Sequence, residues 1–124
     1  MSTFNLKAWI KNVTETLAKK PVFFTGTVGD GMQDGYLCGV YDANTKIVTI
    51  HFACRSSSNI STSQTLLVVP AEYRPSTNKT LPASLYLSGG GSMAHRVTLS
   101  TTGYITQAGS SSTRGVFGSG SYKI

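Results

Sequence analysis

Two histidines and five acids are the residues of this chain that could carry acid–base chemistry or bind a metal. His51 and His95 each stand in a strand-like segment without an acid well placed beside them in the sequence, and catalysis requires a partnered nucleophile or acid. A glycosidase pair or a Ca²⁺ site would have to come from Asp30 and Asp34, whose loop GDGMQDG lacks the alternation and terminal Glu of an EF-hand. The sequence therefore predicts a protein that is not an enzyme, with no catalytic residue, no metal site and no cofactor.

The composition favours a β-protein with an uncharged polar surface. Hydrophobic residues make up 40% of the 124 residues and charged residues only 13%. Hydroxyl and amide groups both donate and accept hydrogen bonds, so this surface suits glycan binding, and it equally suits a β-domain with hydroxyl-rich loops. The net charge of +6 raises the expectation of an anionic partner. Nucleic acid is nevertheless not expected, because no dense basic run or aromatic stacking platform is present.

No targeting or membrane segment is expected. The first 20 residues carry charges throughout and have no continuous apolar core, unlike a signal peptide. No window approaches the roughly 18 apolar residues of a membrane span. The expectation is a soluble protein, made in the cytoplasm of the cell that produces it, without a signal peptide and with no membrane partner.

One helix is expected, within residues 1–20. Apolar residues recur there at spacings of three and four, which places them on one helical face: Leu6, Trp9, Ile10, Val13 and Leu17. Ser2, Thr3 and Asn5 are candidate caps, and Pro21 ends the helix. The stripe either packs on the chain's own sheet or forms a short parallel bundle with other copies. Fewer than two heptads do not hold a coiled coil alone, so a bundle would need help from the β-domain.

Residues 21–124 are expected to form one head domain. Short runs separated by turn signals indicate about nine strands of an antiparallel sandwich or barrel. We expect an all-β fold, a jelly-roll-like antiparallel β-sandwich preceded by one α-helix. The expected strands are 22–28, 36–41, 47–54, 65–69, 84–88, 94–100, 104–108, 114–117 and 120–124, with a tight turn at 101–103 and a polar loop at 55–64.

The hairpin expected over residues 36–54 decides the state of the two cysteines. With a turn at residues 42–45, Cys38 lies opposite Thr49, and Cys54 points to the other face of the sheet. A disulfide requires Cα atoms within about 7 Å. Two free, mostly buried thiols are therefore expected.

The loops are expected to separate into two groups. If successive strands run back and forth, the Gly/Ser-rich loops at 29–35, 55–64, 89–93 and 109–113 fall at the end of the domain opposite the helix. The turns at 42–45 and 101–103 and the longer 70–82 loop then lie at the helix end. Loops clustered at one end of a rigid β body commonly form a binding surface, although mobile loop tips have the same composition.

The most distinctive segment is Leu66–Leu85, LLVVPAEYRPSTNKTLPASL. Its prolines cannot donate ladder hydrogen bonds and so mark strand ends or edges. Tyr73 and Arg74 are expected to order the 70–82 loop by bonding backbone carbonyls. The arrangement resembles the LP-x-x-YRP segment of C-terminal tip domains in tail fibre and receptor-binding proteins of tailed bacteriophages. The RVTLSTTGYITQ hairpin and the opening AWIKNVTETL segment are similar to the same family.

This resemblance implies a phage or prophage tail structural protein of the virion. Such domains are homotrimers that bind a bacterial surface polysaccharide or teichoic acid without cleaving it, alongside other phage tail proteins. The candidate glycan-binding residues are those of the distal loops: Asp30, Gln33, Asp34, Tyr36, Arg55, Asn59, His95 and Arg114. Acids and amides would meet sugar hydroxyls, Tyr36 would stack on a sugar, and Arg side chains would meet phosphates or acidic sugars. A virion adaptor or decoration protein and a small bacterial carbohydrate-binding module remain as alternatives.

Overall fold

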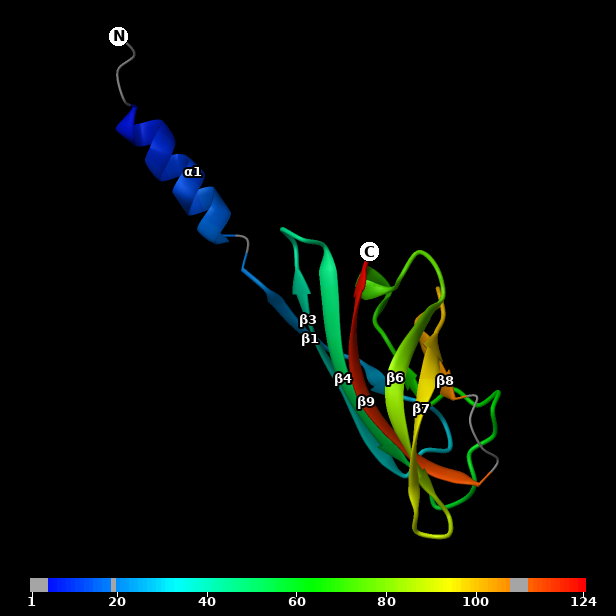
Figure 1. Cartoon of the computed structure of the whole chain (residues 1–124). Helices are drawn as coiled ribbons and strands as arrows, with labels where there is room; N and C mark the ends of the chain where they lie inside the picture. Colours follow the sequence, from blue (N-terminus) through cyan, green and yellow to red (C-terminus); the bar gives the residue numbers. More distant parts are fainter. Residues whose placement is uncertain (1–4, 19, 108–111) are drawn as a thin grey trace.

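The structure, a computed structural model, describes residues 5–18, 20–107 and 112–124, and of residues 13–18 only the backbone. Within these ranges one α-helix, α1 (Leu6–Ala18), precedes nine strands, and a short 3₁₀ helix, η1 (Ala71–Tyr73), lies between the fifth and the sixth (Figure 1). The predicted all-β fold with one amino-terminal helix is confirmed. The strands are β1 (Val22–Thr25), β2 (Thr27–Val28), β3 (Asp34–Asp42), β4 (Ile47–Arg55), β5 (Leu67–Val68), β6 (Lys79–Leu87), β7 (Ser92–Leu99), β8 (Tyr104–Gln107) and β9 (Thr113–Lys123).

All nine strands belong to one antiparallel sheet, in the order β1-β3-β4-β9-β6-β7-β8-β5-β2. The two ends of this order, β1 and β2, are separated in the chain only by Gly26, whose amide donates to the Leu37 carbonyl at 2.8 Å. β1 pairs with β3, and β2 pairs with β5. The chain thus changes its partner strand at Gly26. Where the sequence predicts a sandwich, the strands form one sheet that is curled nearly into a barrel.

The core lies inside this curled sheet and follows the period-two alternation of its strands. In β4, Val48, Ile50, Phe52 and Cys54 are buried, whereas His51 between them is exposed. The same alternation in β6 and β7 supplies the facing side of the core. The sheet therefore has a continuous apolar interior and an outer face whose side chains remain available for contacts.

Helix α1 extends beyond one end of the sheet instead of packing on it (Figure 1). The predicted cap is present at Asn5, whose Oδ1 accepts the amide of Ala8 at 3.1 Å. Three residues of the apolar stripe are each about half exposed: Leu6, Trp9 and Ile10. The other stripe residues and candidate caps lie outside the described side chains: Val13, Leu17, Ser2 and Thr3.

The β3–β4 hairpin keeps the predicted faces but not the predicted register. Cys38 pairs with His51 rather than with Thr49, because the turn lies one residue later and includes Lys46 in the left-handed region with φ of 59°. A shift of two positions preserves the face of every side chain, since strands alternate with period two. Both thiols are free as predicted, and Cys54 is buried, but Cys38 is exposed, contrary to expectation.

β6 and β9 are longer than predicted because their Pro and Gly residues do not interrupt them. Pro82 lies inside β6 opposite Arg96, where the ladder to β9 starts only at the next residue, Ala83. The missing proline N–H therefore falls at the end of that ladder. A Cβ at Gly118 would approach the Pro82 carbonyl oxygen to 2.6 Å. Gly118 thus permits close strand packing in β9, where the sequence had suggested a break.

The 70–82 loop is fixed against the helix end of the barrel. Arg74 Nε donates to the Val69 carbonyl at 3.3 Å, as predicted. Tyr73 contributes through its ring and its backbone instead of through the predicted bond from its hydroxyl to a carbonyl. The ring stacks on Phe24 with ring centroids 4.1 Å apart, and the Tyr73 carbonyl accepts the hydroxyl of Tyr122 at 2.6 Å. The Tyr-Arg-Pro motif therefore holds the fold together at the end opposite the glycine-rich loops (Figure 1).

Candidate functional site

The glycine-rich and serine-rich loops at 29–35, 55–64 and 89–93 lie at the end of the barrel opposite α1, as the sequence predicted (Figure 1). The first two of these loops are joined by hydrogen bonds. The Gln33 amide donates to the Arg55 carbonyl at 2.7 Å, and Gln64 Nε2 donates to the Asp30 carbonyl at 3.2 Å. The 29–35 and 55–64 loops consequently form one connected surface; residues 109–111 of the fourth loop lie outside the described residues.

The 55–64 loop is anchored through its buried Ile60. The Ile60 amide donates to the Thr113 carbonyl at 2.7 Å, and its carbonyl accepts Nε2 of the buried Gln107 at 3.1 Å. The Ser56 amide donates to the Arg114 carbonyl at 2.8 Å. Because its apolar anchor is buried and its backbone groups are paired, the 55–64 loop is held in a fixed position. We call this loop and the 29–35 loop bonded to it the loop platform.

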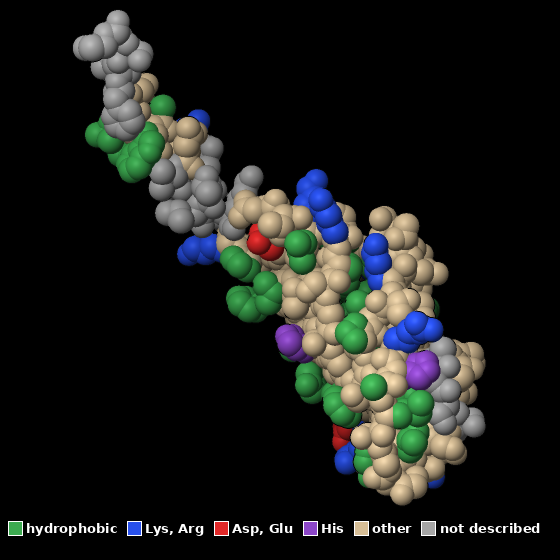
Figure 2. All heavy atoms as spheres, in the orientation of Figure 1, with side chains coloured by type: hydrophobic (Ala, Val, Ile, Leu, Met, Phe, Trp, Pro, Cys, Tyr) green, Lys and Arg blue, Asp and Glu red, His purple; other side chains and the backbone are tan. Residues whose placement is uncertain are grey.

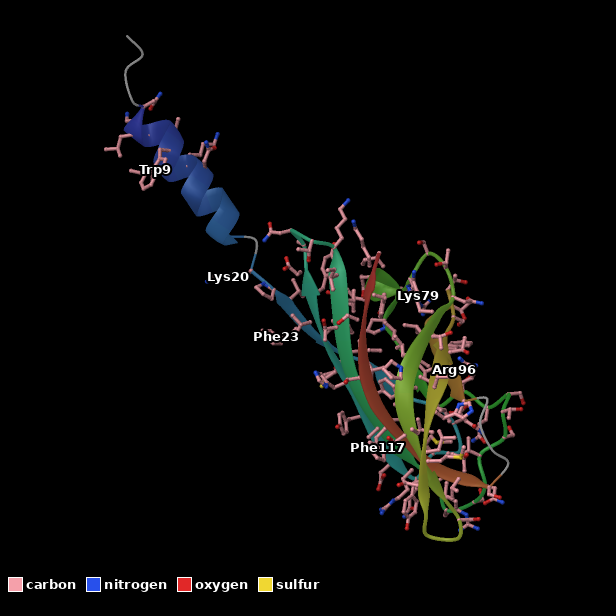
Figure 3. All side chains as sticks on the ribbon, in the orientation of Figure 1. Trp9, Lys20, Phe23, Lys79, Arg96 and Phe117 are labelled. Carbon is pink, nitrogen blue, oxygen red and sulfur yellow. The ribbon has the colours of Figure 1, made fainter. Side chains whose placement is uncertain are left out.

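A shallow pocket of about 670 Å³ opens on the outer face of the sheet next to this platform. We call it the aromatic pocket, because Tyr36, Tyr86 and Phe117 all line it and are each about half exposed. The other lining residues are Asp34, Gly35, Ala53, Cys54, Arg55, Gly115 and Val116. In Figure 3 Phe117 projects outward from β9 towards the loop end of the barrel.

Strand register brings these residues together from four strands. Tyr36 of β3 lies opposite Ala53 of β4, which lies opposite Phe117 of β9. In the neighbouring row Gly115 stands between Arg55 and Tyr86. Because Gly115 has no side chain, the space between the guanidinium and the phenol stays open, and this gap deepens the pocket.

A charged pair borders the aromatic pocket at its loop end. Arg55 Nη2 donates to Asp34 Oδ2 at 3.0 Å, and both side chains are about 60% exposed. An ion pair this exposed contributes little to stability. It does, however, hold a carboxylate and a guanidinium in fixed positions beside aromatic rings, where they can bond hydroxyl groups of a ligand.

The thiol under the pocket is not suited to nucleophilic chemistry. Burial raises the pKa of Cys54 to about 11, only partly opposed by a hydrogen bond with the Val116 backbone, and the Asp34 charge raises it further. The thiolate is the reactive form of cysteine. At neutral pH Cys54 is therefore protonated, and it serves as part of the pocket floor.

The structure brings three of the predicted glycan-binding residues together, Asp34, Tyr36 and Arg55. Two more form a separate pair, in which Arg114 Nε of β9 donates to Asn59 Oδ1 of the 55–64 loop at 3.0 Å.

The remaining three predicted residues lie elsewhere. Asp30 lines a different surface hollow together with Gln64, and Gln33 contributes its backbone amide to the loop platform. His95 is half-buried within β7, and its Nδ1 lies 3.3 Å from the Arg96 carbonyl oxygen. The sequence places His95 at the loop end because it predicts a strand that begins at residue 94, whereas β7 already begins at Ser92.

Sequence reasoning missed Tyr86 and Phe117. Alternation within LYL and VFG could have placed both side chains on an outer face. Their meeting with Tyr36 depends on β9 pairing with both β4 and β6, and strand order is not encoded in local alternation.

In the part of the chain that the structure describes, no three His, Cys, Asp or Glu side chains are grouped so that they could hold a metal ion. The described helix is too short and too polar to cross a membrane.

No protein-family model matches this sequence, and no curated protein shows significant similarity to it.

Proposed function

We propose that this chain is a tail structural protein of a phage or prophage that binds a host cell-surface glycan as a homotrimer, without cleaving it. The observation that carries the proposal is the aromatic pocket, which combines three exposed aromatic rings with the Asp34–Arg55 pair beside an anchored loop platform. The Tyr-Arg-Pro segment supports the phage assignment through the resemblance described above. Its role at the opposite end of the barrel leaves the loop end free for recognition.

The pocket suits an extended polysaccharide. Aromatic rings offer flat apolar surfaces to the C–H faces of sugars, and the Asp34 and Arg55 groups can accept from and donate to hydroxyls. A phosphate of teichoic acid or an acidic sugar would meet the Arg55 guanidinium bidentately. The pocket is shallow and formed from strands, which favours a chain lying across it over an enclosed small molecule.

Binding without cleavage agrees with the carboxylates at the loop end. Asp34 is held by Arg55 at 3.0 Å, whereas Asp30 lies in another hollow. A glycosidase needs two carboxyl groups facing each other across one sugar-binding site. The two acids of this loop do not share such a site.

A trimer would give a weak site useful strength. A single sugar contact of about millimolar affinity is worth about 4 kcal/mol, and three copies that engage one polymeric surface multiply their affinities through high effective concentration. The half-exposed stripe of Leu6, Trp9 and Ile10 supplies apolar surface for such an assembly at the end away from the pocket.

The test is binding of the purified protein to intact bacterial cells and to their purified wall polysaccharide and teichoic acid. Tyr36→Ala and Tyr86→Ala should each weaken binding about tenfold or more, because each stacked ring is worth about 1 kcal/mol and three sites engage together. Tyr104→Ala is the matched control, since Tyr104 is equally exposed but lies on β8, outside the pocket.

Failure of the wild-type protein to bind any cell or wall fraction of a permissive host would contradict the proposal. Equal binding by the wild type and both pocket variants would show that glycan recognition does not use the aromatic pocket. Capture by other virion proteins in place of cells would favour the adaptor role.

A further inference from the structure

We infer that Arg96 is a second contact point for the glycan, and that the glycan is an anionic polymer. Arg96 lies on β7, on the outer face of the sheet that also carries the aromatic pocket. The inference rests on the proposed function and deepens it, because a host-surface glycan can be neutral or charged. It assigns the anionic group of the polymer, a phosphate or a carboxylate, to Arg96.

Strand register places Arg96 on the same face as the aromatic pocket. Phe117 of β9 lies opposite Ser84 of β6, and Ser84 lies opposite Ala94 of β7. Arg96 follows Ala94 by two residues, so its exposed side chain points to the same side of the sheet. In Figure 3 Arg96 lies between Phe117, nearer to the loop end, and Lys79 at the helix end. One surface therefore joins Arg96 to the pocket.

The strands around Arg96 carry no acids. No Asp or Glu occurs in β6, β7, β8 or β9, and none follows Glu72 in the sequence. In Figure 2 Lys and Arg side chains lie on the right-hand half of the barrel, whereas the acidic side chains in view lie further left. The basic residues after Glu72 are Arg74, Lys79, Arg96, Arg114 and Lys123. This half of the barrel is therefore positive and attracts anions.

Arg96 differs from Arg55 in its charge environment. Arg55 Nη2 lies 3.0 Å from Asp34 Oδ2, so an anion that approaches Arg55 is repelled by the carboxylate beside it. Among the described residues of β7 and of its neighbours β6 and β8, no acid offsets the charge of Arg96. A guanidinium binds a phosphate or a carboxylate through two parallel N–H donors. The stronger contact for the anionic group is therefore Arg96, and the pocket binds a sugar ring.

The separation of the two arginines requires a polymer. Arg55 shares a cross-strand row with Gly115, Tyr86 and Ser92, and Ser92 precedes Arg96 by four residues on β7. Three strand spacings of about 4.8 Å and four residues at about 3.4 Å give a separation of about 20 Å along the sheet. One sugar ring is much shorter than this. A polysaccharide that lies diagonally across the face can stack on the pocket rings and place an anionic group at Arg96.

The path between the pocket and Arg96 has small, neutral side chains. Ser84 and Ala94 lie between Phe117 and Arg96, and Pro82 lies opposite Arg96. Pro82 and Ala94 are exposed, and Ser84 is half-buried. The Ser84 hydroxyl can donate to or accept from a sugar hydroxyl. These side chains leave room for a polymer to lie against the strands.

The test measures binding of three polymers: polygalacturonate, the same polymer after its carboxyl groups are reduced to alcohols, and purified wall teichoic acid. The wild type should bind the two acidic polymers at least fivefold more tightly than the reduced one, and salt should weaken this preference. Arg96→Gln should lower the affinity for the acidic polymers at least fivefold and leave that for the reduced polymer unchanged. Lys20→Gln is the matched control, since it removes one positive charge from an exposed position at the helix end, and it should change each affinity less than twofold.

Ala94 offers a second variant at an exposed position. Ala94→Glu places an acid on the same face two residues from Arg96, where it offsets the guanidinium and repels an anion. It should weaken binding of both acidic polymers at least fivefold, whereas Ala94→Gln, of the same size without the charge, should change it less than twofold. Tyr36→Ala acts at the pocket and should weaken binding of all three polymers by a similar factor, because ring stacking on a sugar needs no charge.

An Arg96→Gln protein that loses no more affinity for the acidic polymers than Lys20→Gln would overturn the inference. A wild type that binds the reduced polymer as tightly as the acidic ones, or binds neither acidic polymer, would also overturn it. Binding to cells that Tyr36→Ala weakens would then leave the proposed function standing, whereas absence of cell binding as well would refute both. Tighter binding of a single-stranded oligonucleotide than of either acidic polymer would assign Arg96 to nucleic acid and overturn the inference.

Discussion

Replacing Tyr122 by Phe should destabilise the protein at neutral pH and make it less sensitive to alkali. The Tyr122 side chain is 5% exposed, and its hydroxyl donates to the Tyr73 carbonyl at 2.6 Å. Loss of the hydroxyl leaves that part-buried carbonyl without its donor. The expected cost is about 1.5 kcal/mol in the free energy of unfolding, equivalent to a fall of roughly 5 °C in Tm for a chain of this size.

The alkaline behaviour follows from the titration of the same hydroxyl. Burial raises the pKa of Tyr122 above its ordinary value of 10.0, so the folded state disfavours the phenolate. This contribution to stability is complete below pH 10 and is lost as the pH rises above 10, at up to about 1.4 kcal/mol per pH unit. Tyr122→Phe lacks the titrating group, so the difference in stability between the two proteins should nearly vanish by pH 11.

Urea unfolding at pH 7, 9, 10 and 11, followed by near-ultraviolet circular dichroism, measures both effects. Tyr104→Phe is the matched control, because Tyr104 is 47% exposed and its hydroxyl is not shielded from water. Equal stability of the wild type and Tyr122→Phe at pH 7 would refute the role given to this bond. A difference that stays constant from pH 9 to pH 11 would refute the role given to burial of the phenol.

The remaining predictions concern close strand packing and the buried thiol. Gly118→Ala should lower the free energy of unfolding by about 2 kcal/mol or more, since its Cβ would lie 2.6 Å from the Pro82 carbonyl oxygen. Gly89→Ala, where a Cβ meets nothing within 4 Å, should change it by less than about 0.5 kcal/mol, and similar losses in both variants in thermal melts would contradict the packing argument. Burial raises the pKa of Cys54 from 9.0 to about 11, so the wild type should lose about 1 kcal/mol between pH 9 and pH 10 that Cys54→Ala does not lose. Cys38→Ala, at an exposed position, should retain the wild-type pH dependence, and parallel pH profiles of the wild type and Cys54→Ala would show that the thiol makes no such contribution.

Local patterns predicted the parts of the fold that depend on neighbouring residues. The helix and its Asn5 cap follow from apolar spacing and capping chemistry. The faces of Cys38 and Cys54 follow from period-two alternation. They are predicted correctly although the predicted register is wrong, because the register differs by two positions. The bond from Arg74 to a nearby carbonyl follows from its place in a proline-bounded loop.

Errors arose where a residue's role depends on a strand distant in sequence. Pro82 reads as a strand end, yet it is tolerated inside β6 because the ladder to β9 begins one residue later. Gly118 reads as a break, yet it lies in the longest strand because a side chain there would collide with β6. Strand propensity depends on the residue type alone, whereas the neighbouring strand determines whether Pro82 and Gly118 can lie inside a strand.

The sequence by itself determined the fold class, the end of the molecule at which the loops gather, and which residues of each strand face outward, because these follow from short-range spacing and from the number of chain reversals. Only the tertiary structure decided that Tyr86 and Phe117 join Tyr36 beside Arg55 and Asp34 in one pocket, and that Arg96 lies on the same face as this pocket. The physical reason is strand order. β9 lies between β4 and β6, and the long-range pairing that puts it there arises from how the whole core packs.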